Sequence, residues 1–143
     1  LGVGKDADNL YITCKVKDGE LYSGGQGTQK GSGVFIYLDT KNECLKEPAE
    51  GVYKVWCSYK GDITVWQGNK GKWENSELEG LQITPSVVSG GYELAFTIPL
   101  NRSFNKDAMR LCATLSTKTY TETLVHSNAD RSCTWMKMNL GGH

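Results

Sequence analysis

Three of the four tryptophans in this 143-residue chain lie within one stretch, YKVWCSYKGDITVWQGNKGKW, from Tyr53 to Trp73. Apolar and polar residues alternate on either side of a glycine, which is typical of two β-strands joined by a tight turn. Directly paired residues of an antiparallel ladder lie on the same face. A three-residue loop that ends at Gly61 or is centred on it therefore places Trp56 and Trp66 on one face, whereas a two-residue loop mixes the two faces.

Two indole rings on the polar face of a β-ribbon could bind a sugar. The C–H face of a pyranose is apolar and packs on an aromatic ring, while its hydroxyl groups reach outward, and a rigid Trp side chain loses little conformational entropy on binding. We predict that Trp56 and Trp66 are stacking surfaces, with Trp73 as a third wall. The groups predicted to orient the sugar are Lys54, Gln67 and Asn69.

An alternative is that a loop or a second layer covers this face, so that the tryptophans fill a satellite core. The two interpretations differ for Trp56→Ala. Sugar binding on an exposed ring predicts lost affinity with little change in stability, whereas a satellite core predicts a large loss of stability.

The remainder of the chain predicts the frame that positions this hairpin. Alternation of apolar and polar residues, or a short apolar run, recurs in six further segments, which are 10–17, 34–40, 81–85, 92–100, 110–125 and 133–138. No segment has a helical stripe of ten or more residues. About eight strands with turn signals at short spacing predict an all-β fold, an antiparallel β-sandwich that is jelly-roll-like, formed by residues 1–143 as a single domain.

Composition excludes several classes of partner. Sixteen basic and sixteen acidic side chains cancel, and neither sign forms a block. The chain thus lacks the basic surface that nucleic acids require. No apolar run is long enough to span a bilayer, so we expect no membrane insertion.

The five cysteines lack the Cys-x-x-Cys spacing of zinc and thioredoxin-like sites. Their odd number leaves at least one thiol free or paired between chains. Cys14 and Cys57 are in register with apolar neighbours and are predicted to be small core residues.

The sequence offers little that is typical of catalysis. The glycine-rich segment 24–33 contains neither a P-loop nor a dinucleotide-binding motif. The two histidines, His126 and His143, belong to no nucleophile motif. The acidic residues that could act in glycoside hydrolysis lie in one polar loop or on a strand face rather than in an evident pair, and are Glu74, Glu77, Glu79 and Glu93. We expect a non-catalytic domain.

Four segments read together resemble family 9-like carbohydrate-binding modules and the related DOMON domains. They are DADNLYITCKVKD, GSGVFIYLDT, GNKGKW and GGYELAFTIPL, in that order. The resemblance implies a β-sandwich attached to an extracellular, periplasmic or cell-surface protein, often a bacterial polysaccharide-degrading enzyme. It also implies an oligo- or polysaccharide as ligand and a catalytic domain of the same parent protein as a further partner.

The chain departs from the family pattern in two places. Ala95 stands where the late strand often has an acidic residue, and the family's additional N-terminal strands have no counterpart before Asp6. Because the chain starts at Leu1 rather than at a methionine, we expect a processed product or a fragment that lacks these first strands.

The resemblance raises the question of a structural calcium ion, which family members commonly bind. Calcium takes six to eight oxygen ligands, and the candidates here are Asp6, Asp8, Asn9 and Asp39. Their spacing is not that of an EF-hand loop, so solvated turn carboxylates stay the competing interpretation and no metal is assigned.

Two other functions stay open. The chain could be a structural domain that packs against a catalytic domain without a ligand of its own. Alternatively, the DOMON kinship implies a haem-binding domain. Met136 and Met138 could serve as ligands, although they alternate as ordinary core residues would.

Overall fold

The computed structural model describes residues 1–22, 31–116, 121–123 and 131–140. Within these ranges the chain forms eleven β-strands and one short 3₁₀ helix, η1 (Ser132–Thr134). The strands are β1 (Gly2–Lys5), β2 (Asn9–Lys17), β3 (Gly33–Asp39), β4 (Val52–Ser58), β5 (Ile63–Asn69), β6 (Lys72–Asn75), β7 (Gln82–Val88), β8 (Gly91–Pro99), β9 (Ala108–Ser116), β10 (Thr121–Thr123) and β11 (Met136–Asn139).

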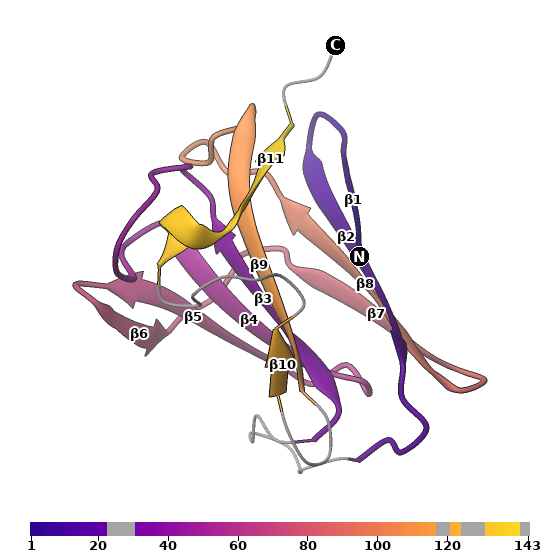
Figure 1. The fold of residues 1–143 in the computed structure, drawn as a ribbon. Helices are drawn as coiled ribbons and strands as arrows, with labels where there is room; N and C mark the ends of the chain where they lie inside the picture. Colours follow the sequence, from indigo (N-terminus) through magenta and orange to yellow (C-terminus); the bar gives the residue numbers. More distant parts are fainter. Residues whose placement is uncertain (23–30, 117–120, 124–130, 141–143) are drawn as a thin grey trace.

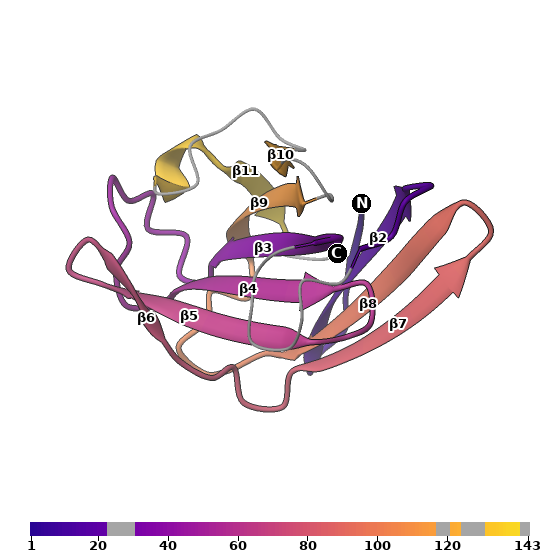
Figure 2. The same ribbon diagram turned by 90° about the horizontal axis from the view of Figure 1, so that it is seen from below.

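The strands form two antiparallel sheets that face each other. The smaller sheet has the order β1-β2-β8-β7, and the larger has the order β10-β9-β3-β4-β5-β6, with β11 also paired to β9 (Figure 1). Seen from below, the two sheets are two layers (Figure 2). The predicted antiparallel β-sandwich is therefore confirmed, and the described residues alone form eleven strands rather than about eight.

The smaller sheet follows the alternation that its sequence predicts. Ile12 of β2 pairs with Phe96 of β8, and Leu10 pairs with Ile98. All four side chains are buried between the sheets, whereas Tyr11 points outward and is exposed. The core-facing row is therefore set by period-two patterning, since successive side chains of a strand point to opposite faces.

The larger sheet is buried on much of both faces. Its inner row, which includes Ile36, Val55 and Leu111, packs in the main core. A second apolar cluster lies on the outer face, the face directed away from the smaller sheet, and centres on Tyr37, Cys112 and Trp135. This double burial explains why β3 is apolar on nearly both faces.

Two segments far apart in sequence lie over part of the outer face. The loop of residues 40–51 places Leu45 in the second cluster. The backbone N–H of Leu45 donates to Ser132 Oγ of η1 at 2.6 Å. A disulfide, Cys44–Cys133, joins the loop to η1. Figure 2 shows these two segments side by side.

The prediction that Cys14 and Cys57 are small core residues is confirmed. Cys14 and Cys57 are free and buried in the main core, and Cys112 is free and buried in the second cluster.

The strands that the sequence did not predict are short and exposed. β1 is exposed along its length, and β6 has one partly buried residue, Trp73. They exist because a neighbouring strand offers hydrogen bonds rather than because of an apolar pattern. The alternating segment 110–125 contains parts of two strands, β9 and β10, which pair with each other.

Strand β7 is a free edge of the smaller sheet and carries Pro85. Proline is tolerated at edges because it lacks the N–H that a central strand needs. The last two residues of β7, Val87 and Val88, are exposed, at 62% and 41%. In the ranges that the structure describes, no helix is both long and apolar enough to cross a bilayer.

Candidate functional site

The β4–β5 hairpin has the register that keeps the two indoles on one face. Trp56 pairs with Thr64, and Lys54 pairs with Trp66. The loop is residues 59–61 and ends at Gly61, whose φ of +95° is accessible to glycine at little cost. Trp56 and Trp66 therefore lie diagonally on the outer face, as predicted.

Trp56 nevertheless has no exposed ring face. Its side chain is 1% exposed, and its ring centroid lies 4.8 Å from that of Phe35 on the neighbouring strand. The ring also lies over Gly33, where an added Cβ would be 2.5 Å from the indole. The expectation that both rings of the pair are exposed is wrong for Trp56, because strand parity fixes the face of a residue but not what packs on it.

Trp66 and Trp73 remain partly exposed on this face. Trp73 of β6 pairs with Gly68 of β5, which puts its ring on the same side as Trp66. Both rings border the ammonium of Lys54, whose Nζ lies 4.8 Å from the centroid of Trp66 and 5.8 Å from that of Trp73. Lys54 thus stands between two of the predicted stacking rings.

Lys54 also lies over two rings of β3. Its Nζ is 5.3 Å from the centroid of Phe35 and 5.9 Å from that of Tyr37. Each cation–π contact at such distances contributes roughly 0.5–1 kcal/mol. We call Phe35, Tyr37, Lys54, Trp66 and Trp73 the aromatic face. The ammonium of Lys54 contacts all four of its rings.

The aromatic face is supported by a tryptophan that the sequence did not single out. The ring of Trp135, 3% exposed, lies 5.8 Å from that of Tyr37, which is 6.0 Å from the ring of Trp73. Trp135 follows η1 and is held near β3 by the Cys44–Cys133 disulfide. Nothing in the local sequence connects Trp135 to the hairpin, because the contact is created by long-range packing.

Gln67 and Asn69 lie on the opposite face from Trp66. Gln67 pairs with Glu74, and Asn69 pairs with Lys72, so their side chains alternate away from Trp66 and Trp73. The prediction that these two amides line the rim of the same platform is wrong in its geometry. Odd and even positions of one strand face opposite sides, and this signal was present in the sequence.

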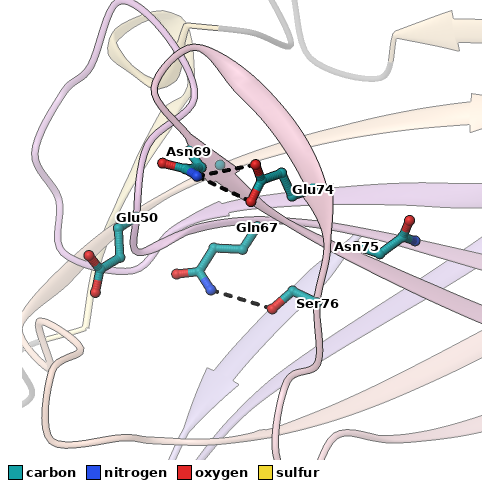
Figure 3. A pocket seen from close by; sticks show the side chains of 7 residues that line it. Glu50, Gln67, Asn69, Glu74, Asn75 and Ser76 are labelled. Carbon is teal, nitrogen blue, oxygen red and sulfur yellow. Dashed lines mark hydrogen bonds between the residues drawn. The ribbon is translucent and has the colours of Figure 1, made fainter.

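The two amides instead line a pocket of about 320 Å³. Figure 3 shows the polar residues that line it, which are Glu50, Gln67, Asn69, Glu74, Asn75 and Ser76. The side chain of Asn75 points away from the others, because Asn75 is directly paired with Trp66. We call it the polar pocket. It lies between the β5–β6 ribbon and the end of the 40–51 loop.

Asp6 has partners within its own turn. Its Oδ1 accepts the N–H groups of Asp8 and Asn9, each at 2.8 Å, and its Oδ2 accepts the Tyr11 hydroxyl at 2.6 Å. The Tyr11 hydrogen bond and then these two N–H groups lower the pKa of Asp6. The carboxylate therefore organises a turn, as the competing interpretation of a turn carboxylate proposes.

Asp39 is fully buried at the end of β3. Its carboxylate accepts the N–H of Glu43 at 3.2 Å and that of Cys44 at 3.0 Å. It thereby shapes the start of the 40–51 loop. Across the described ranges, no three or more His, Cys, Asp or Glu side chains gather in a group that could hold a metal ion.

The residues considered for haem lie in different settings. Met136 and Met138 pair with Leu111 and Met109, on the core side of β9. Met138 is buried in the main core and Met136 is exposed at its margin. His126 and His143 fall outside the described residues.

Comparison with known proteins gives a result for structure alone. The chain matches no protein-family model, and no curated protein matches it. It is similar to two solved structures of a family 9 carbohydrate-binding module from Caldicellulosiruptor kristjanssonii, one in complex with cellotriose and one with glucose. In both cases the TM-score is 0.79 at 15% sequence identity over 99% of this chain, with 73% and 75% of the other chains covered. This chain therefore has the fold of a family 9 carbohydrate-binding module, as its sequence resemblance implies, while kinship to DOMON domains stays a prediction.

Proposed function

We propose that this chain is a non-catalytic carbohydrate-binding module that binds an oligo- or polysaccharide on the aromatic face. The observation that supports it is the arrangement of two partly exposed indoles, Trp66 and Trp73, around the ammonium of Lys54. Indole rings supply the apolar surface on which a sugar ring packs, and an ammonium supplies hydrogen-bond donors for hydroxyl groups. The saccharides bound by the two structural neighbours are consistent with this ligand class.

The residues have different roles in this proposal. Trp66 and Trp73 contact the sugar, and Lys54 orients it. Trp56 is buried beneath Phe35 and supports the platform without contacting the ligand. This assignment moves the binding surface from the centre of the hairpin toward β6.

The proposal includes a setting outside the cytoplasm. The Cys44–Cys133 disulfide supports an oxidising compartment, since such bonds persist in secreted, periplasmic and surface proteins. We therefore place the chain in an extracellular, periplasmic or cell-surface protein that processes polysaccharide, with a catalytic domain of the same protein as a further partner.

Calorimetric titration with cellotriose, together with affinity electrophoresis on soluble polysaccharides, tests the proposal. Trp66→Ala and Trp73→Ala should each weaken binding by about 2 kcal/mol, roughly 30-fold in Kd, as expected for a central aromatic contact. Tyr11→Ala is the matched control, because Tyr11 is an exposed aromatic residue on the smaller sheet. Binding that is unchanged in both tryptophan variants, with circular dichroism showing an intact fold, contradicts the assignment.

A structural role is the second candidate, favoured by the exposed Val87 and Val88 of the β7–β8 hairpin. These consecutive valines end β7 on opposite faces, and a neighbouring domain could pack on either one. If this is the function, Val87→Ser with Val88→Ser weakens association with the parent protein's catalytic domain, and no saccharide binds the chain.

A further inference from the structure

We propose that the polar pocket is a second binding site, specific for the hydroxyl groups of a neutral sugar. It lies on the opposite face of the β5–β6 ribbon from Trp66 and Trp73, because Gln67 and Glu74 are directly paired and alternate away from both indoles. The inference goes beyond the proposed function, because the pocket uses neither indole ring.

Four polar side chains of the pocket are hydrogen-bonded to one another in two pairs (Figure 3). Asn69 Nδ2 donates to both carboxylate oxygens of Glu74, at 3.2 and 3.1 Å. Gln67 Nε2 donates to Ser76 Oγ at 3.4 Å, and Gln67 Oε1 accepts the N–H of Gly51 at 3.0 Å. These bonds hold the side chains in place before a ligand arrives, which lowers the entropy lost on binding.

The donors and acceptors of the pocket match a sugar. A hydroxyl group both donates and accepts, so it needs a surface that offers both functions. The carboxylates of Glu50 and Glu74 accept, whereas the NH₂ group of Gln67 and the hydroxyl of Ser76 donate. A volume of about 320 Å³ is at the lower end of the range for small-molecule sites, roughly 300–1,000 Å³, and fits a single sugar ring.

The same groups are a poor match for a divalent cation. Calcium requires six to eight oxygen ligands, and the pocket offers two carboxylates, Glu50 and Glu74. The side-chain oxygen of Gln67 already accepts from Gly51, and Asn69 turns its NH₂ group rather than its oxygen toward Glu74. The Asn69 NH₂ group directed at Glu74 favours a ligand with hydroxyl groups over a metal ion.

A ¹H–¹⁵N NMR titration of the whole chain tests the inference, with glucose, galactose, mannose and cellotriose as probes. The side-chain NH₂ signals of Gln67 and Asn69 report the polar pocket. The indole N–H signals of Trp66 and Trp73 report the aromatic face. We expect the amide signals to shift saturably with at least one of these sugars.

Single substitutions distinguish binding at the polar pocket from binding at the aromatic face. Glu74→Gln and Asn69→Ala should weaken the amide response at least tenfold, whereas Trp66→Ala should leave it unchanged. Glu79→Gln is the matched control, because Glu79 is an exposed glutamate outside the pocket.

Each outcome decides between the two proposals. Shifts confined to the indole signals overturn the polar-pocket site and leave the proposed function standing, and shifts confined to the amide signals do the reverse. Absence of any shift overturns both. Amide shifts produced by CaCl₂ and by none of the sugars overturn the inference in favour of a cation site.

Discussion

The four tryptophans differ in what their rings contact. Trp56 and Trp135 are buried, at 1% and 3% exposure, and fill the outer face of the larger sheet. Trp66 and Trp73 are partly exposed beside Lys54. A tryptophan in the first pair therefore contributes to folding, whereas one in the second pair is available to a ligand.

Substitution of Trp56 should reveal this difference. Trp56→Ala is expected to lower the free energy of unfolding by about 3–5 kcal/mol, because it leaves a large cavity under Phe35. Trp66→Ala should cost less, since its ring is already partly in water. Urea unfolding followed by circular dichroism measures both, and a Trp56→Ala variant as stable as the native chain would contradict the packing described.

The buried thiols give a dependence on pH. Burial raises the pKa of the Cys14 thiol from 9.0 to about 11. Burial is also the main cause that raises the pKa of the Cys57 thiol from 9.0 to about 12. The folded state therefore holds these protons more tightly than the unfolded state does. Their contribution to stability is complete below pH 9 and is lost as the pH rises toward 11 for Cys14 and 12 for Cys57, at up to about 1.4 kcal/mol per pH unit for each thiol.

Two measurements check this expectation. In the native state at pH 8, Cys14, Cys57 and Cys112, the buried free thiols, should not react with a thiol reagent, and all three should react in guanidinium chloride. Unfolding free energy measured from pH 8 to 11 should fall less steeply for Cys57→Ala than for the native chain. Fast native-state labelling at pH 8 would show that the core opens.

At the scale of elements, the end of β5 and the 40–51 loop fit together only because position 68 is glycine. A Cβ added at Gly68 would clash with the backbone of Ala49 and lie 2.6 Å from the carbonyl carbon of Pro48. The N–H of Gly71, in the turn after β5, donates to Pro48 O at 2.8 Å. The loop and the β5–β6 ribbon therefore act as one unit beside both candidate sites.

Gly68→Ala should separate the 40–51 loop from the β5–β6 ribbon. The added methyl group meets backbone atoms that cannot rotate away, so we expect a loss of about 1–3 kcal/mol of stability and movement of the loop. Gly4→Ala is the control, because no atom lies within 4 Å of its added Cβ. Denaturation together with NMR signals of the 48–51 backbone reports the effect, and equal stability of both variants would contradict the contact.

The sequence predicted which residues form strands and turns better than it predicted which residues pack against them. Period-two alternation sufficed for β2 and β8, and glycine chemistry sufficed for the loop at Gly61, because these depend on neighbouring residues. The cover over Trp56 depends on packing with β3, and the support of Tyr37 by Trp135 depends on residues about a hundred positions away. The wrong face assigned to Gln67 and Asn69 was avoidable, since alternation from Trp66 already excluded it.

At the scale of the whole molecule, one covalent bond connects distant parts of the larger sheet's outer face. Cys44 and Cys133 are 89 residues apart, in the 40–51 loop and η1. The two bonded cysteines lie outside the core between the sheets. The bond joins the two segments that supply Leu45 and Trp135 to the cluster around Tyr37. Stability and the shape of the aromatic face thus depend on the same disulfide.

Removal of the disulfide tests this dependence. Cys44→Ser with Cys133→Ser should lower stability by about 2–4 kcal/mol, because the unfolded chain regains the entropy of a long loop. Far-UV circular dichroism should remain that of a β-sandwich, while the near-UV signal of Trp135 and Tyr37 weakens. Collapse of the far-UV spectrum would show instead that the larger sheet itself depends on the bond.

The proline on strand β7 has a consequence for many copies of the chain held close together. A free sheet border with an unbroken row of amide donors can recruit the same border of another copy and grow into a filament. Pro85 interrupts that row in the middle of the strand. Copies of this chain brought close together would therefore remain separate molecules rather than join edge to edge.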